Sequence, residues 1–244
     1  MKRRKFIKGS AAIGLGLAIF PQIAFQHSDN NITYNELIGK GNPEVSGDGF
    51  KLRNDAYNAF LKMSEEALKS NIKLQTVSSY RTFEHQNRIW ERKYKNNINN
   101  GLSEQQSIKK IIEYSTIPGT SRHHWATDID LIDGNVLQPN TVLNPKHFEG
   151  LGCFSKFKIW MDTYAKAFGF YLVYTHKTNR KGFKHEPWHY SYKPLSQGYL
   201  KAYQKLDLRD IIISEQLMGC EHFSEEFITN YLNQNILDIN PELL

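Results

Sequence analysis

The stretch "TSRHHWATDID", residues 120–130, joins a loop to the start of a predicted strand. The loop before it, "STIPGTS" (115–121), contains a Pro-Gly pair that favours a turn. The run "ATDIDLI" (126–132) alternates polar and apolar residues as a half-buried strand does. Asp128 and Asp130 are two positions apart, so both should project from the same face of that strand.

Hydrophobic periodicity extends the secondary structure in both directions from this strand. Helix 155–168 is the clearest, because its apolar residues recur at helical spacing, Ser155 can cap its start and Gly169 suits its end. Ser103 is the predicted N-cap of a second, shorter helix that begins at that residue. We expect helices over 54–69, 83–97, 103–114 and 155–168, strands over 72–80, 126–132, 170–175 and 188–192, and helical segments near 196–205 and 222–233.

This order predicts an α+β fold, with a small, mainly antiparallel sheet and helices packed around it. The last two strands are joined by a basic loop, 176–185, which favours antiparallel pairing and which we expect to be a solvated hairpin tip. We expect a linker and entry loop over 27–50, a single main domain over 51–194, and a C-terminal helical extension, 195–244, packed on that domain.

The first 26 residues resemble an export signal. Five basic residues lie among the first eight positions, so the net charge of +6 leaves only about +1 for the rest, which argues against a nucleic-acid partner. An apolar run interrupted by Pro21 follows, and "RRKFIKG" resembles a twin-arginine motif. We expect an exported, periplasmic or cell-envelope protein, monomeric, that touches the membrane only through this segment if it is not removed.

The two cysteines, Cys153 and Cys220, lie far apart in sequence. They cannot form a metal site unaided, so we interpret them as packed residues or as one optional disulfide.

Three polar clusters lie where predicted strands meet loops: "SSYRTFEHQ" (78–86), "SRHHWATDID" (121–130) and "HEPWHY" (185–190). Histidine and carboxylate are ligands that zinc accepts, and a catalytic zinc needs about three of them with a carboxylate nearby to take a proton from water. The candidates of these types are His123, His124, Asp128, Asp130, His185, Glu186 and His189.

Geometry narrows this set only in part. Residues three apart on a regular strand point to opposite faces, so Glu186 can reach the site of His189 only if the chain bends at Glu186-Pro187. The choice between Asp128 and Asp130 stays open from the pattern alone.

The chain resembles the VanY-like zinc D-alanyl-D-alanine carboxypeptidases over roughly 72–192. That family carries S-x-H-x-x-G-x-A-x-D followed by E-x-x-H, often as E-P-W-H, and an upstream S-x-Y-R-S/T-x-x-x-Q segment. Ser121, His123 and Asp130 fall on the first motif, and Glu186 and His189 fall on the second. Two positions differ from the first motif: Ala126 replaces its glycine, and Asp128 replaces its alanine. Alanine in place of the glycine at position 126 costs little stability if the backbone needs no positive φ.

The resemblance implies a role for each matching residue. His123, Asp130 and His189 would bind zinc, and Glu186 would be the general base that later protonates the leaving amine. Arg81 would bind the substrate's terminal carboxylate, because guanidinium matches a carboxylate bidentately, and Gln86 and Ser121 would assist it. His124 is expected beside the site or facing solvent, whereas Asp128 would support a ligand or stabilise the loop.

The predicted function is a zinc metallopeptidase, a carboxypeptidase that removes the terminal D-alanine of peptidoglycan stem peptides. The alternatives are an L,D-carboxypeptidase or endopeptidase of the same fold, or a non-catalytic, zinc-containing module that binds the cell wall. The presence of both Glu186 and Arg81 disfavours the module, since a protein that only binds needs no such pair.

Overall fold

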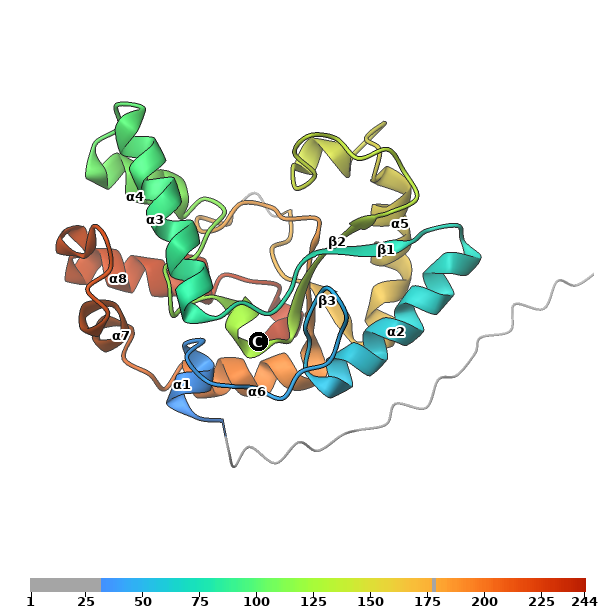
Figure 1. The fold of residues 1–244 in the computed structure, drawn as a ribbon, viewed down its shortest axis with the longest axis horizontal. Coiled ribbons are helices and arrows are strands. Elements are labelled where there is room, and N and C mark those ends of the chain that lie inside the picture. The colour runs from blue at the N-terminus through green and yellow to red at the C-terminus, as the bar shows by residue number, and fades with distance from the viewer. Residues whose placement is uncertain (1–31, 177–178) are drawn as a thin grey trace, which may run out of the picture.

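A computed structural model of the chain describes residues 32–176 and 179–244 (Figure 1). The expected signal segment, 1–26, lies outside them. Within the described ranges, every helix is too short or too polar to cross a bilayer.

A small sheet forms the centre of the fold. Its four strands are β1 (Leu74–Ser78), β2 (Asp128–Asp133), β3 (Phe170–Leu172) and β4 (His189–Tyr192), in the order β1-β2-β4-β3. All three pairings are antiparallel, including the predicted pairing of the last two strands. The α+β prediction is therefore confirmed, although β1 and β3 are shorter than predicted. The register of β1 shifts between Thr76 and Ser78, where the strand bulges before it leaves the sheet.

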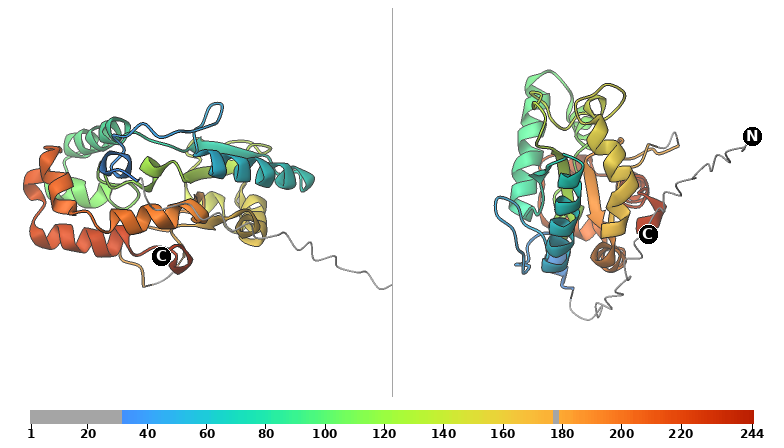
Figure 2. Two further views of the ribbon diagram at one scale, coloured as in Figure 1. Left: turned by 90° about the horizontal axis from the view of Figure 1, so that it is seen from below. Right: turned by 90° about the vertical axis from the view of Figure 1, so that its right-hand side faces the viewer.

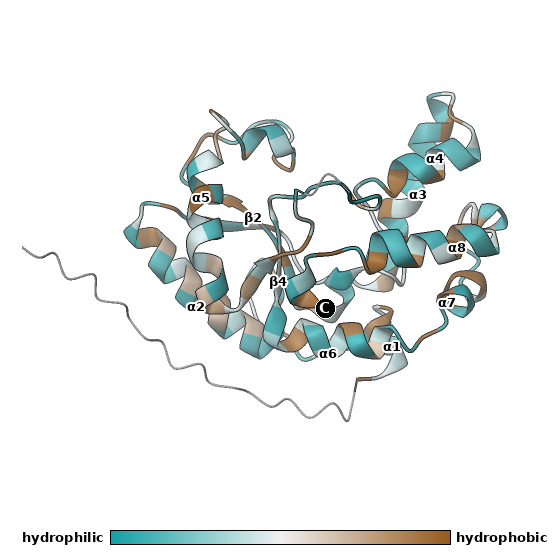
Figure 3. Cartoon of the chain, turned by 180° about the vertical axis from the view of Figure 1, so that it is seen from behind, coloured by the Kyte–Doolittle hydropathy of each residue, from teal (hydrophilic) through white to brown (hydrophobic). Residues whose placement is uncertain are grey.

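The helices match most of the predicted segments. They are α1 (Tyr34–Leu37), α2 (Asn54–Lys69), α3 (Phe83–Asn99), α4 (Glu104–Ile111), α5 (Ser155–Tyr164), α6 (Lys193–Tyr203), α7 (Leu208–Ser214) and α8 (Glu225–Tyr231). The short helices α1 and α7 were not predicted. Hydrophilic and hydrophobic residues share the surface of each longer helix, as amphipathic packing requires (Figure 3).

The helix caps were predicted with mixed success. Ser103 caps α4 and forms a capping box with Gln106. Ser155 does not cap α5, because Phe154 occupies the N-cap position and offers no side-chain oxygen. The predicted helix 155–168 also tightens into a 3₁₀ turn over Ala165–Phe168, which ends at Gly169 with φ 82°.

One face of the sheet packs against α2 and α5. Ile129 and Leu131 of β2 belong to this core together with Met63 of α2 and Phe157 of α5, and all four are fully buried. Since these β2 side chains point into the core, the alternate residues Asp128 and Asp130 project from the opposite face.

A second core joins α3 and α4 to the C-terminal helices, which lie beside them at one end of the molecule (Figures 1 and 2). Trp90 and Tyr94 of α3 share this core with Tyr203, Ile211 and Tyr231 of the C-terminal region.

The described part of the basic loop, 176 and 179–185, is only partly the solvated hairpin tip that its sequence suggested, because exposed residues alternate there with packed ones. Arg180 Nε donates to the Asp238 carbonyl at 3.0 Å. A Cβ on Gly182 would lie 1.6 Å from the carbonyl oxygen of Gln234, so the two backbones touch there. Phe183 is buried against Tyr231. Residues 180–183 therefore pack on the C-terminal segment, which supplies contacts that the local sequence does not reveal.

Candidate active site

A single 3₁₀ turn positions the first histidine. The turn spans Arg122–Trp125, and the Ser121 hydroxyl caps it by accepting from the His123 N–H at 3.3 Å. Ala126 ends the turn in the left-handed conformation, with φ 57°. The backbone therefore does need a positive φ at Ala126, where the family motif has glycine. The expectation that alanine is tolerated there without loss of stability is thus wrong, because the left-handed conformation costs an alanine roughly 1 kcal/mol.

A bend at the start of β4 positions the second histidine and its neighbouring carboxylate. The chain turns at Glu186-Pro187, and the His189 N–H donates to the Glu186 carbonyl at 3.1 Å. The bend that Glu186 needs in order to reach the site of His189 is thus present. It brings Glu186 Oε2 to 3.0 Å from His189 Nδ1, although the two residues are three positions apart.

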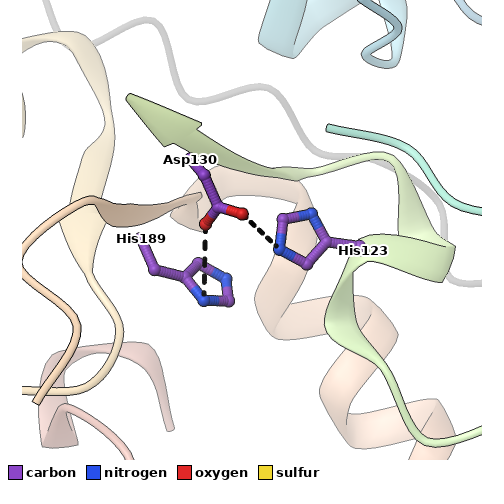
Figure 4. Close-up of side chains that lie close together, drawn as sticks. All are labelled: His123, Asp130 and His189. Atoms are coloured by element: carbon purple, nitrogen blue, oxygen red, sulfur yellow. Dashed lines mark ion pairs between the residues drawn. The ribbon is translucent and has the colours of Figure 1, made fainter. Parts of the chain in front are cut away.

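Three side chains from three segments converge above β2 (Figure 4). Asp130 Oδ2 lies 3.5 Å from His123 Nε2, and Asp130 Oδ1 lies 3.9 Å from His189 Nδ1. One donor atom from each residue lies within 4.8 Å of the others, and all three side chains are buried. Asp130 Oδ1 has no hydrogen-bond partner among the described residues. The structure therefore brings together the three predicted ligands.

The far nitrogen of each ring is held by a protein oxygen. His123 Nδ1 lies 2.8 Å from the Ser79 carbonyl, and His189 Nε2 lies 3.0 Å from Asp128 Oδ2. A neutral imidazole that donates from its far nitrogen turns the lone pair of its near nitrogen toward the cluster. Two imidazole nitrogens and a carboxylate oxygen with a free lone pair are a donor set that fits zinc.

The protonation of the site follows from burial and charge. Burial, together with the nearby Arg81, lowers the pKa of His123 to about 4, so this ring is neutral at pH 7. Burial also lowers the pKa of His189, but hydrogen bonds to Asp128 and Glu186 outweigh it and raise the pKa to about 9. A metal ion at this position has to displace that proton, because only the neutral ring is a ligand. Burial raises the pKa of the Glu186 carboxyl above its usual value.

Asp128, which the sequence left unplaced, lies behind His189 and not in the cluster. Arg122 Nε donates to its Oδ2 at 2.8 Å, and the Ser191 hydroxyl donates to its Oδ1 at 2.6 Å. Asp128 is fully buried. Its carboxylate is therefore held by neighbours while it orients the ring of His189.

The cluster opens into a cavity of about 580 Å³ that also contains Arg81 and Glu186. Arg81 Nη1 donates to Gln86 Oε1 at 2.7 Å, and Arg81 Nη2 lies 3.8 Å from Asp130 Oδ2. Gln86 is buried and does not line the cavity; its Nε2 donates to the Thr116 carbonyl at 2.8 Å, which fixes its orientation. The Ser121 side chain lines the same cavity.

Two other histidine candidates lie outside the cluster. His124 is buried, with Nδ1 at 2.7 Å from the Arg81 carbonyl and Nε2 accepting from the Gly119 N–H at 3.2 Å. It therefore connects the loops and does not face solvent. His185 Nδ1 contacts the Tyr174 carbonyl at 2.8 Å, and His185 does not line the cavity. Cys153 and Cys220 are unpaired, so they form no disulfide in this structure, and the interpretation as packed residues is wrong for Cys153, which is exposed.

The sequence model of the VanY family, described as D-alanyl-D-alanine carboxypeptidase, matches residues 49–195, more than half of the chain. The chain belongs to the VanY D-alanyl-D-alanine carboxypeptidase family. It is an enzyme of that kind, a peptidoglycan carboxypeptidase by family.

Three curated relatives of this VanY family member share between 28% and 32% sequence identity with it. An uncharacterized protein of Haemophilus influenzae is 32% identical over 43% of this chain and 82% of its own length. A D-alanyl-D-alanine carboxypeptidase of Enterococcus faecalis is 28% identical over 57% of this chain, but the match spans only 47% of that protein. The bifunctional D-Ala-D-Ala dipeptidase and carboxypeptidase VanXYC of Enterococcus gallinarum is 31% identical over 59% of this chain and 67% of its own length.

Solved structures share the fold. The vancomycin-resistance D,D-pentapeptidase VanY, solved with Zn(II), superposes with a TM-score of 0.51 at 22% identity, over 67% of this chain and 85% of that chain. VanYB in complex with D-alanine-D-alanine superposes with a TM-score of 0.52 at 22% identity, over 72% of this chain and 92% of that chain.

The sequence did not predict the role of Arg122. It precedes His123 directly, yet its guanidinium turns back to Asp128 and stacks over the Trp125 ring at 4.8 Å. An arginine three positions before an aromatic residue and six before an aspartate gives no local signal, because both contacts depend on the 3₁₀ turn between them.

Proposed function

We propose that this protein is a zinc-dependent carboxypeptidase that removes the terminal D-alanine of peptidoglycan stem peptides. The observation that carries the proposal is the convergence of His123, Asp130 and His189, each with one donor atom within 4.8 Å of the others, beside the buried Glu186. Membership of the VanY family supports the substrate class. So does the Enterococcus gallinarum relative, which is named for D-Ala-D-Ala hydrolysis.

His123, Asp130 and His189 would hold the zinc ion. Three protein ligands and one open position are the arrangement of catalytic zinc sites. When bound, zinc lowers the pKa of a coordinated water to about 7 and polarises a carbonyl oxygen. The Ser79 carbonyl and the Asp128 carboxylate fix the two imidazole rings, which preserves the geometry of the site when no substrate is present.

Glu186 is the proton carrier in this proposal. Its carboxylate accepts a proton from the attacking water and then delivers it to the nitrogen of the departing D-alanine. The buried environment that raises its pKa makes the protonated form accessible for the second transfer.

Arg81 recognises the free carboxylate that defines a carboxypeptidase substrate. Its Nη1 is anchored by Gln86, so the planar guanidinium is already oriented before substrate binds. Its buried Nε has no hydrogen-bond partner among the described residues, which leaves this donor available to a carboxylate oxygen. The Ser121 hydroxyl lies in the same cavity and can donate to that carboxylate.

The test is release of D-alanine, followed by mass spectrometry, from tetrapeptide and pentapeptide stems with zinc or with a chelator. We expect the zinc-loaded protein to shorten a stem by one D-alanine and the chelated protein to be inactive. The length of the hydrolysed stem separates D,D- from L,D-cleavage. Zinc binding with no cleavage of any stem would support the binding module instead.

The Glu186→Gln variant tests the proton carrier. Loss of general acid–base catalysis lowers kcat by about 10²- to 10⁴-fold, while the zinc content stays the same. Glu65→Gln, on the exposed surface of α2, is the matched control and should keep full activity. A Glu186→Gln variant as fast as the parent would make the assignment wrong.

We also propose export through the twin-arginine route, which rests on the N-terminal sequence alone. Replacing Arg3 and Arg4 by lysine should retain the protein in the cytoplasm, as measured by fractionation. Unchanged export of that variant would refute this route.

A further inference from the structure

Helix α3 forms one wall of the cavity and presents two cations there that the proposed mechanism does not use. Ile89, Arg92 and Lys93 all line the cavity that contains Glu186 and Arg81. Their spacing of three and four positions places them on one helical face. The core face of α3 is a different one.

No carboxylate of the described residues lies within ion-pair distance of these two cations. Among the described residues, neither the Arg92 nor the Lys93 side chain forms an ion pair or a hydrogen bond. The next lysine of the helix behaves differently, because Lys95 Nζ lies 3.0 Å from a carboxylate oxygen of Glu91 on the outer surface. Arg92 and Lys93 therefore differ from Lys95 in that they border the cavity without a carboxylate partner among the described residues.

The acidic residues of the cavity are already engaged. Asp130 and Glu186 are the only two acids among the described lining residues, and both contact His189. Lys93 is partly buried, and this burial lowers the pKa of its ammonium group, with Arg81 and Arg92 adding to the effect and Glu186 opposing it. An anion that enters beside Lys93 and Arg92 gives these cations the contact partner that no described residue provides.

We propose that Arg92 and Lys93 bind a second carboxylate of the substrate. This inference rests on the proposed function. The departing D-alanine carries a methyl side chain and one carboxylate, which Arg81 takes, so the second carboxylate belongs to the part of the peptide on the amino side of the scissile bond. Guanidinium and ammonium groups together form charge-assisted hydrogen bonds with such a group.

Two residues of a stem peptide can supply that carboxylate. One is a diamino diacid, diaminopimelate, at the third position, where lysine lacks the side-chain carboxylate. The other is γ-linked D-glutamate at the second position, whose free α-carboxylate is absent from D-isoglutamine. Each pair of peptides differs in one carboxylate, so four pentapeptides cover both sources.

The test measures binding of these four peptides to the zinc-loaded Glu186→Gln variant, and their turnover by the parent protein. We expect loss of the recognised carboxylate to weaken binding by about tenfold to a hundredfold, the range for hydrogen bonds to charged groups. The pair that shows the difference identifies the source. Adding Arg92→Gln and Lys93→Gln should reduce the ratio within that pair to about 1.

Lys95→Gln is the matched control, because it removes one positive charge from the same helix but outside the cavity. It should keep the ratio. Equal binding of all four peptides, or an equal loss of the ratio in Lys95→Gln, would overturn the subsite. Binding preference without hydrolysis of any peptide would refute the proposed function and support the subsite, whereas hydrolysis without preference would do the reverse.

Discussion

His189 lies between buried carboxylates and presents a different ring nitrogen to each side. Nδ1 faces Asp130 and Glu186, and Nε2 faces Asp128 at 3.0 Å. Burial works to raise the pKa of the Asp128 carboxyl, but the Arg122 guanidinium and the His189 hydrogen bond hold it well below its usual range. A permanently charged acceptor behind the ring increases the basicity of the nitrogen that faces the cluster.

The variant Asp128→Asn tests this arrangement. An amide at this position no longer provides a charged acceptor for Nε2, so zinc affinity should fall by about 10- to 100-fold. The measurement is competition with a chelator of known affinity, on protein shown to be folded by circular dichroism. Asp48→Asn, on an exposed loop, should bind zinc like the parent. Unaltered zinc affinity in Asp128→Asn would contradict the role given to this carboxylate.

Among the elements, the reversal between the 3₁₀ turn Ala165–Phe168 and β3 depends on one glycine. Gly169 adopts φ 82°, and a Cβ there would lie 2.8 Å from the Tyr192 ring and 3.3 Å from Pro194. Tyr192 is itself paired with Phe170 across β3 and β4, with ring centroids 5.3 Å apart. The glycine thus lets the turn approach the strand that carries His189.

Gly169→Ala should lower the free energy of unfolding by about 2–5 kcal/mol. Roughly 1–2 kcal/mol comes from the left-handed backbone, and about 1–3 kcal/mol comes from overpacking against Tyr192. Gly101→Ala is the matched control, because its φ is 85° and a Cβ there meets open space. The Gly101→Ala variant should lose only the roughly 1–2 kcal/mol that comes from the left-handed backbone. Urea denaturation measures both, and equal losses would show that the contact with Tyr192 is unimportant.

The long periodic elements could be predicted, and the short ones could not. α2 begins and ends where its apolar spacing predicts. α7 escaped prediction because three consecutive isoleucines give no helical period, and the helix is stabilised by burial of Ile211 and Ile212 in the second core. Tertiary burial of this kind leaves no local pattern.

At the scale of the whole molecule, the C-terminal extension, which lies beyond the family match, supports a loop of the cavity. The Tyr231 hydroxyl accepts from the Ile117 N–H at 3.0 Å and lies 2.8 Å from Thr120 Oγ1. The Tyr203 hydroxyl donates to the Gly119 carbonyl at 3.0 Å. This loop carries the Thr116 carbonyl that orients Gln86, and Gln86 in turn anchors Arg81.

Tyr231→Phe should therefore destabilise the protein by about 1–3 kcal/mol, because the buried Ile117 N–H loses its acceptor. Tyr164→Phe, on the exposed side of α5, is the control and should change the unfolding free energy by less than about 0.5 kcal/mol. Both values come from urea denaturation. An equally small change in Tyr231→Phe would mean that the loop is held by other contacts.

The family resemblance singled out His123, Asp130 and His189, and the structure brings these three side chains into one cluster. The pattern alone could not choose between Asp128 and Asp130, because both project from the same face of one strand. The partner of Asp128 could not be predicted, because its contact with His189 joins two strands far apart in the sequence. The α3 cations were missed for a similar reason: the sequence shows helical spacing, but not which face borders a cavity.

The most direct test of the central claim is the location of zinc in a crystal of the loaded protein, from anomalous scattering at the zinc edge. We expect one strong peak within bonding distance of His123 Nε2, an Asp130 oxygen and His189 Nδ1. A peak instead at the exposed group Glu104, Glu221 and His222, or none at the buried cluster, would contradict the account.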